Sequence, residues 1–79
     1  MIRVIITEDC QICDLLLHLM RELKIEFIVE TYDPAKHEKY IKKCKGFPII
    51  VYGKKVICGL DFSELEALAE ELERGEKND

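Results

Sequence analysis

Two patterns of apolar residues, a continuous run and then a helical spacing, predict the first two elements of the chain. Residues 1–6 are nearly continuous in apolar, β-branched side chains, which is typical of a buried strand. From Gln11 to Leu23 apolar side chains recur every three or four positions, and this spacing predicts an amphipathic helix. Leu17 lies off the resulting stripe, so we expect it either to meet another helix or to be exposed. The stripe expected to face the core consists of Ile12, Leu15, Leu16, Leu19, Met20 and Leu23.

The middle of the chain predicts a second strand and a second helix. Residues 25–31 alternate between apolar and polar side chains, as in a strand of which one face is more polar than the other. Asp33 and Pro34 then suit the N-cap and the first turn of a helix. Lys45 and Gly46 suit its end. The face of this helix that is expected to be buried comprises His37, Tyr40, Ile41 and Cys44.

The C-terminal part predicts a hairpin followed by a helix. Two apolar runs, residues 49–52 and 55–58, flank a glycine–lysine pair that suits a tight turn. Asp61 and Glu64 have the spacing of a capping-box variant, so a helix is expected to begin there and to stop at Gly75. The side chains that this helix is expected to bury are Phe62, Leu65, Leu68, Ala69 and Leu72.

The order of these elements, βαβ-α-ββα, predicts one α/β domain with a four-stranded mixed sheet and three helices. A right-handed crossover makes the first two strands parallel, and the tight turn makes the last two antiparallel. The domain is expected to span residues 1–75, with residues 76–79 as a frayed tail.

Charges are distributed unevenly around the formal net charge of −4. Residues 34–55 hold seven lysines against Glu38 alone, whereas residues 61–79 carry a balance of −6. A basic patch this small on an acidic chain argues against a nucleic-acid partner, and solvated helix faces explain both runs. No apolar run approaches the roughly 18 residues of a membrane span, and the apolar start is too short for a secretory leader. We therefore expect a cytoplasmic monomer without a membrane partner.

Cys10 and Cys13 carry the clearest candidate chemistry. They open the first predicted helix, where unpaired backbone N–H groups and the helix dipole favour a thiolate. Residues three apart on a helix also lie close enough for a disulfide. Cys10 points away from the apolar stripe and Cys13 lies at its edge, so we expect Cys10 to be accessible and Cys13 sheltered. A Cys-x-x-Cys beside a βαβ pattern predicts dithiol redox chemistry, and the exchange itself needs no cofactor.

The cysteines also allow other interpretations. A metal or iron–sulfur binding module could use Cys10, Cys13, Cys44 and Cys58, because the topology brings all four toward one rim of the sheet. Cys44 and Cys58 are alternatively small buried hydrophobes, or the two halves of a second disulfide. A redox-inactive interaction domain is a further alternative.

Three landmarks together resemble the glutaredoxin and thioredoxin superfamily, and small glutaredoxins above all. They are the Cys-x-x-Cys, a proline that opens the third strand, and a glycine with an acid after the fourth. The resemblance covers nearly the whole chain and implies a thioredoxin-like fold. It also implies that the Phe47–Pro48 peptide bond is cis and that this loop shapes a substrate groove beside the two cysteines. Gln11 stands between the cysteines, where glutaredoxins usually carry a proline.

Glutathione recognition is where the sequence departs from small glutaredoxins. Gly59 and Asp61 match part of a family segment in which a helix N-terminus receives a carboxylate of glutathione, but Cys58 replaces the first glycine of that segment. Glu8 and Asp9 stand where glutaredoxins usually carry a lysine. The negative charges of these acids destabilise the reactive thiolate and repel the carboxylates of glutathione. We therefore expect electrons from a reductase of thioredoxin-reductase type, with glutathione as the alternative.

The sequence thus predicts a thiol–disulfide oxidoreductase that reduces disulfide-containing client proteins and carries electrons in cell redox homeostasis. Cys10 is the expected nucleophile and Cys13 the resolving thiol. The residues expected to bind substrate are Gln11, Phe47, Pro48, Gly59 and Asp61.

Overall fold

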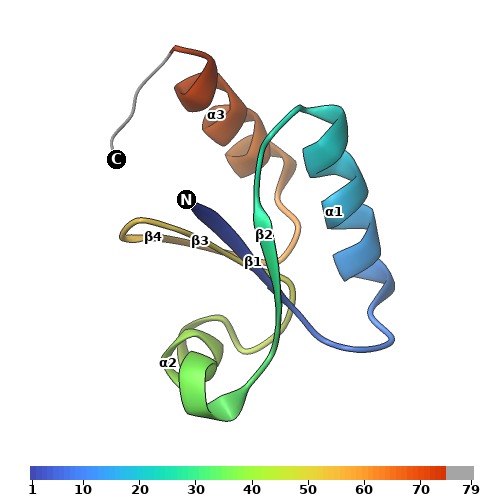
Figure 1. The fold of residues 1–79 in the computed structure, drawn as a ribbon, viewed down its shortest axis with the longest axis vertical. Helices are drawn as coiled ribbons and strands as arrows, with labels where there is room; N and C mark the ends of the chain where they lie inside the picture. Colours follow the sequence, from blue (N-terminus) through green and yellow to red (C-terminus); the bar gives the residue numbers. More distant parts are fainter. Residues whose placement is uncertain (75–79) are drawn as a thin grey trace.

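The computed structural model describes residues 1–74, and the elements follow one another there in the predicted order (Figure 1). The strands are β1 (Ile2–Ile6), β2 (Ile28–Thr31), β3 (Ile49–Tyr52) and β4 (Lys55–Cys58). The helices are α1 (Gln11–Glu22), α2 (Pro34–Cys44) and α3 (Phe62–Glu73). The predicted α/β class with a four-stranded mixed sheet is confirmed. In this part of the chain no helix is both long enough and apolar enough to cross a membrane.

The sheet has the strand order β2-β1-β3-β4. β1 pairs with β2 in parallel, as the crossover rule predicts, and with β3 in antiparallel orientation. β3 and β4 form the predicted hairpin, in which Gly53 has a φ of +60°, an angle that residues with side chains rarely adopt. At one end of the sheet, therefore, β1, β2 and β4 terminate and β3 begins. We call this end the site edge and define it by its terminal residues: Ile6, Thr31, Ile49 and Cys58.

Helices cover both faces of the sheet (Figure 1). α1 and α3 pack on one face, over a first core that includes Val4 and Ile50. α2 packs on the other face, where strand residues of opposite orientation form a smaller second core. The buried members of this second core are Ile5, Ile49 and Val51.

The buried face of α1 differs from the predicted stripe. Leu17, which the pattern left off the stripe, is 8% exposed and belongs to the first core. Ile12 and Leu15 are instead 47% and 44% exposed, and Leu23 is also exposed. The side chains that α1 buries occur at an i, i+3, i+4, i+7 spacing, turned about the helix axis relative to the predicted stripe. They are Cys13, Leu16, Leu17 and Met20.

The second strand is shorter than the predicted 25–31 because the end of α1 uses part of that segment. The Ile25 N–H donates to Met20 O (2.9 Å) and the Lys24 N–H to Arg21 O (3.0 Å), while Lys24 has a φ of +62°. These two bonds make a Schellman motif, in which the residue after the left-handed position returns to pack against the helix. Ile25 is accordingly buried in the first core, and β2 begins only at Ile28.

The last helix begins where predicted, after the N-cap Asp61, but its first residue is not buried. Leu65 and Leu68 are buried as expected, but Phe62 is 60% exposed. Phe62 is in register with Leu65 and Leu68 at i, i+3 spacing, but it is the first residue of α3, directly after the N-cap, at the end of the buried row. The helix ends at Glu73. The predicted stop at Gly75 and the predicted tail, residues 76–79, lie outside the described residues.

Candidate dithiol site at the sheet edge

Cys10 and Cys13 form a disulfide where the chain passes from β1 into α1. Cys10 is the N-cap of α1, with extended backbone angles (φ −118°, ψ 99°). Its sulfur accepts a hydrogen bond from the Cys13 N–H (3.0 Å), so the side chain does what an N-cap oxygen usually does. The Cα atoms of the two cysteines are 5.2 Å apart, well within the range that a disulfide needs.

The two sulfurs differ in exposure in the predicted sense. Cys13 is buried, with 1% of its surface exposed, whereas Cys10 is half-buried. Gln11, between them, is exposed at the first helical position. Cys10 is therefore the more accessible of the two cysteines to a partner thiol or disulfide.

Acidic side chains precede this disulfide. Glu8 and Asp9 are both exposed, and Asp9 has a left-handed φ of 54°, which suits a residue of its type better than most. The N-terminus of α1 favours a thiolate at Cys10, whereas negative charges that precede it in the chain disfavour one. The site is thus less electropositive than the helix terminus alone would make it.

Pro48 and Gly59 lie side by side at the site edge. Ile49 pairs with Ile5 on one side and with Cys58 on the other, so the residues next along, Pro48 and Gly59, continue the same row. The Gly59 N–H donates to Pro48 O (2.8 Å). The Phe47–Pro48 peptide bond is cis, as the family resemblance implied. This row begins next to the end of β1, from which the chain continues toward Cys10.

Phe47 faces the second core. Its ring contacts Tyr32 edge-on, with ring centroids 5.1 Å apart, and it is half-buried against the residues under α2. Its backbone remains at the site edge, while its side chain helps to close the α2 layer. The predicted binding role of Phe47 stays a prediction, and its side chain is engaged in the second core.

Asp61 caps the last helix. Its carboxylate accepts a hydrogen bond from the Glu64 N–H (3.2 Å), as the capping-box spacing predicted. Glu64 itself forms an ion pair with Lys55 (3.3 Å). Because an acidic side chain occupies an N-terminal amide of α3, a carboxylate of a ligand meets a negative charge there. The predicted binding roles of Gln11, Pro48, Gly59 and Asp61 stay predictions.

The remaining cysteines also pair. Cys44 and Cys58 form a second disulfide, which was one of the open alternatives. Cys44 is half-buried and Cys58 is exposed. The alternative that both are small buried hydrophobes is therefore wrong. Within residues 1–74, no three His, Cys, Asp or Glu side chains gather as a set that could hold a metal ion. The metal-module alternative therefore has no ligand set in the described part of the chain.

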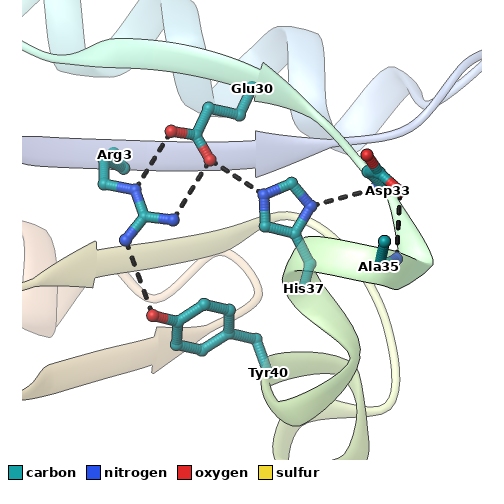
Figure 2. Close-up of polar contacts among 6 residues, drawn as sticks. All are labelled: Arg3, Glu30, Asp33, Ala35, His37 and Tyr40. Carbon is teal, nitrogen blue, oxygen red and sulfur yellow. Dashed lines mark hydrogen bonds and ion pairs between the residues drawn. The ribbon is translucent and has the colours of Figure 1, made fainter.

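A polar cluster under α2 escaped sequence reasoning. Arg3 and Glu30 form two hydrogen bonds (3.1 and 3.2 Å) from β1 to β2, and Arg3 reaches Tyr40 Oη at 3.5 Å (Figure 2). The Arg3 guanidinium, and then His37, lower the pKa of Glu30 by hydrogen bonding, and Glu30 in turn raises the pKa of Arg3. A lone arginine inside an apolar strand was the available signal, but it did not reveal its partner.

His37 is the buried polar member of this cluster and ties it to α2 (Figure 2). The Asp33 N–H donates to His37 Nδ1 (2.9 Å), and a backbone N–H can only donate. We therefore assign the proton of the neutral ring to Nε2, which donates to Glu30 Oε1 at 2.8 Å. The cluster links β1, β2 and the start of α2 on the face away from α1, and so has a structural role beside the site edge.

No protein-family model matches the chain, and no curated protein matches it in sequence. Solved structures match it in fold. The thioredoxin-like protein BC3987 aligns with a TM-score of 0.70 and 18% identity, covering 86% of this chain and 99% of that chain. NrdH-redoxin from Escherichia coli gives 0.66 and 18%, covering 85% and 92%. A glutaredoxin from Archaeoglobus fulgidus gives 0.66 and 20%, covering 85% and 83%.

These matches in fold agree with the four-stranded mixed sheet and three helices of this chain. The chain therefore has a thioredoxin-like fold.

Proposed function

We propose that the protein is a dithiol–disulfide oxidoreductase that reduces disulfides of client proteins. One observation carries the proposal: Cys10 and Cys13 form a disulfide at the N-terminus of α1 with one sulfur half-exposed and the other buried. The structural neighbours support it, because they include thioredoxin-like and glutaredoxin-like redox proteins.

The reaction proceeds by two sulfur exchanges. In the reduced protein, the Cys10 thiolate attacks one sulfur of a client disulfide, forms a mixed disulfide and releases the other client sulfur as a thiolate. Cys13 then loses its proton and attacks Cys10, which restores the Cys10–Cys13 disulfide and releases the second client thiol. Two electrons pass to the client. The Cys13 N–H, which already points at the Cys10 sulfur, stabilises the thiolate form.

The client protein binds to the surface around Cys10. Ile12 and Leu15 present exposed apolar side chains on the first turns of α1. The backbone of Phe47, just before β3, can pair with an extended client segment, as in β-strand addition, whereas Pro48 has no N–H and its carbonyl already accepts from Gly59. Gln11, which is exposed next to Cys10 at the start of α1, belongs to the same proposed surface. A client segment held in this way places its disulfide at Cys10.

For electron supply we propose a reductase of thioredoxin-reductase type. The acids Glu8 and Asp9 precede the dithiol, and the Asp61 carboxylate occupies the N-terminus of α3. All three disfavour an anionic tripeptide such as glutathione. One structural neighbour, NrdH-redoxin, is itself described as a glutaredoxin-like protein with a thioredoxin-like activity profile. We place this activity in the cytoplasm, in cell redox homeostasis.

Turnover of a generic disulfide substrate tests the proposal. Insulin reduction, driven by dithiothreitol, is measured for the wild type, Cys10→Ser and Cys13→Ser. We expect both variants to lose turnover, because each exchange needs its own sulfur. A double variant without the second disulfide, Cys44→Ser/Cys58→Ser, is the matched control and should keep turnover. Full activity in Cys10→Ser would sink the assignment.

A further inference from the structure

The second disulfide lies at the site edge, on the opposite face of the sheet from the first. Cys58 is the last residue of β4 and Cys44 the last residue of α2, 14 residues earlier. Ile57 points into the first core under α1 and α3, so its neighbour Cys58 points to the α2 face. Cys44 packs on the second core there. The two disulfides are thus separate sites.

As in the first disulfide, one cysteine of this pair is more exposed than the other. Cys58 is exposed, whereas Cys44 is half-buried. Exposed disulfides belong to the labile class, whereas buried structural disulfides resist reduction by glutathione. A thiolate from solvent can reach the Cys58 sulfur, with Cys44 as the leaving group.

The surrounding charge also favours exchange. Three exposed lysines, Lys42, Lys43 and Lys45, flank Cys44 in sequence. Cations near a sulfur stabilise its thiolate, and a more stable leaving thiolate departs faster. The C-terminal end of α2 acts against this, and the lysines of the last turn offset it. Lys42 also forms an ion pair with Glu38 (3.6 Å), so the segment around Cys44 is basic on balance, whereas the acids Glu8 and Asp9 precede the first pair.

We propose that Cys44 and Cys58 are a second redox couple, which exchanges electrons with external thiols independently of Cys10 and Cys13. A thiolate of a partner dithiol attacks Cys58, the Cys44–Cys58 bond breaks, and Cys44 leaves as a thiolate. The second thiol of the partner then attacks the mixed disulfide and releases Cys58. Two electrons pass to the pair, which ends as two thiols, and the partner ends as a disulfide.

A redox titration of the variant Cys10→Ser/Cys13→Ser tests the proposal without the first couple. The oxidised variant is equilibrated with mixtures of reduced and oxidised glutathione, alkylated and weighed by mass spectrometry, while circular dichroism reports its folding. We expect Cys44 and Cys58 to become alkylated together, as one two-electron couple, in molecules that keep the native spectrum. In the wild type, Cys44 and Cys58 should likewise become alkylated together while the chain stays folded.

Two results would overturn the proposal. In one, the pair resists glutathione and its thiols appear only after denaturant unfolds the chain, as for a structural disulfide. In the other, reduction of the pair itself unfolds the variant. If the double variant does not fold when oxidised, the same titration on the wild type decides, because alkylated peptides identify which pair has been reduced.

The charge difference between the two sites gives a second test. Oxidised protein is reduced with 2-mercaptoethanesulfonate, an anionic thiol, or with cysteamine, a cationic thiol of similar size, and rates are compared per thiolate. At low ionic strength we expect the anionic thiol to reduce Cys44–Cys58 about threefold faster. The variant Lys42→Gln/Lys43→Gln/Lys45→Gln should lose this preference, whereas Lys54→Gln should keep it. Equal rates in the wild type would contradict the role given to the lysines.

Discussion

At the scale of single residues, the chemistry of Cys10 could be predicted because it depends on local spacing. Two cysteines three apart after a strand predict a helix N-terminus, and Cys10 is indeed the N-cap whose sulfur accepts the Cys13 N–H. The cluster of Arg3 with Glu30 could not be predicted in this way. Its members are 27 residues apart and meet only because of the register between β1 and β2. Single-sequence patterns contain no information about that register.

The lowered pKa of Glu30 predicts how stability depends on pH. The folded state holds its carboxylate by hydrogen bonds from Arg3 and then His37, so the folded pKa is below the unfolded value. The contribution is therefore fully present above the unfolded pKa, about 4.3, and is lost as the pH falls through the folded pKa. Because the pair is part-exposed, we expect Glu30→Gln to lower the free energy of unfolding by only about 1 kcal/mol at pH 7.

Urea unfolding at several pH values measures this effect. The difference between wild type and Glu30→Gln should stay constant above about pH 5 and shrink below about pH 4. Glu66→Gln, which removes an exposed carboxylate of α3, is the matched control and should change stability by less than about 0.5 kcal/mol. A difference that grew at low pH would have the wrong sign.

At the scale of elements, the existence and order of strands and helices followed from the sequence, but their orientation and ends did not. The leucines of α1 are numerous enough to support two overlapping stripes, and the packing on the sheet selects the one that contains Leu17. Lys24 gives no sign of a helix end, because glycine is the usual residue at a left-handed position. The Schellman motif there removes Ile25 from the predicted strand.

A matched pair of leucine substitutions tests the orientation of α1. Leu17→Ala removes a side chain that is 8% exposed in the first core, whereas Leu15→Ala removes one that is 44% exposed. We expect the first to cost about 2–4 kcal/mol in the free energy of unfolding and the second less than about 1 kcal/mol. A larger loss for Leu15→Ala than for Leu17→Ala in urea unfolding would show that the helix lies in the orientation of the predicted stripe.

At the scale of the whole molecule, the fold determines which distant segments share the site edge. The parallel pairing of β1 with β2 and the antiparallel pairing with β3 bring Pro48 and Gly59 to the same edge as the end of β1. The landmarks around the Cys-x-x-Cys predicted this arrangement through family resemblance. The pairing of Cys44 with Cys58 was only one of several alternatives, because cysteine count and spacing do not determine connectivity.

The acidic surroundings of Cys10 predict a preference among electron donors. We expect the oxidised protein to turn over with NADPH and a thioredoxin-reductase-type enzyme, and poorly with glutathione and glutathione reductase. The Cys10–Cys13 potential should lie nearer about −270 mV than about −200 mV. Replacing the acids, in Glu8→Gln/Asp9→Asn, should raise the rate with glutathione roughly threefold to tenfold at low ionic strength.

The acidic residues of the last helix provide the control for this experiment. Glu66→Gln/Glu70→Gln removes the same number of charges from exposed positions of α3 and should leave the rate with glutathione unchanged. Efficient turnover of the wild type with glutathione alone would show that the acids do not control the choice of donor.

Trapping of the mixed disulfide tests the central claim most directly. Reduced Cys13→Ser, in the Cys44→Ser/Cys58→Ser background, is mixed with a disulfide-containing client, and peptide mass spectrometry locates the bond. Cys10 is then the sole remaining thiol, and its half-exposed sulfur should form a stable adduct, because the buried resolving thiol is gone. In the same background, Cys10→Ser leaves only the buried Cys13 and should form almost no adduct. A strong adduct on Cys13, and none on Cys10, would contradict the account.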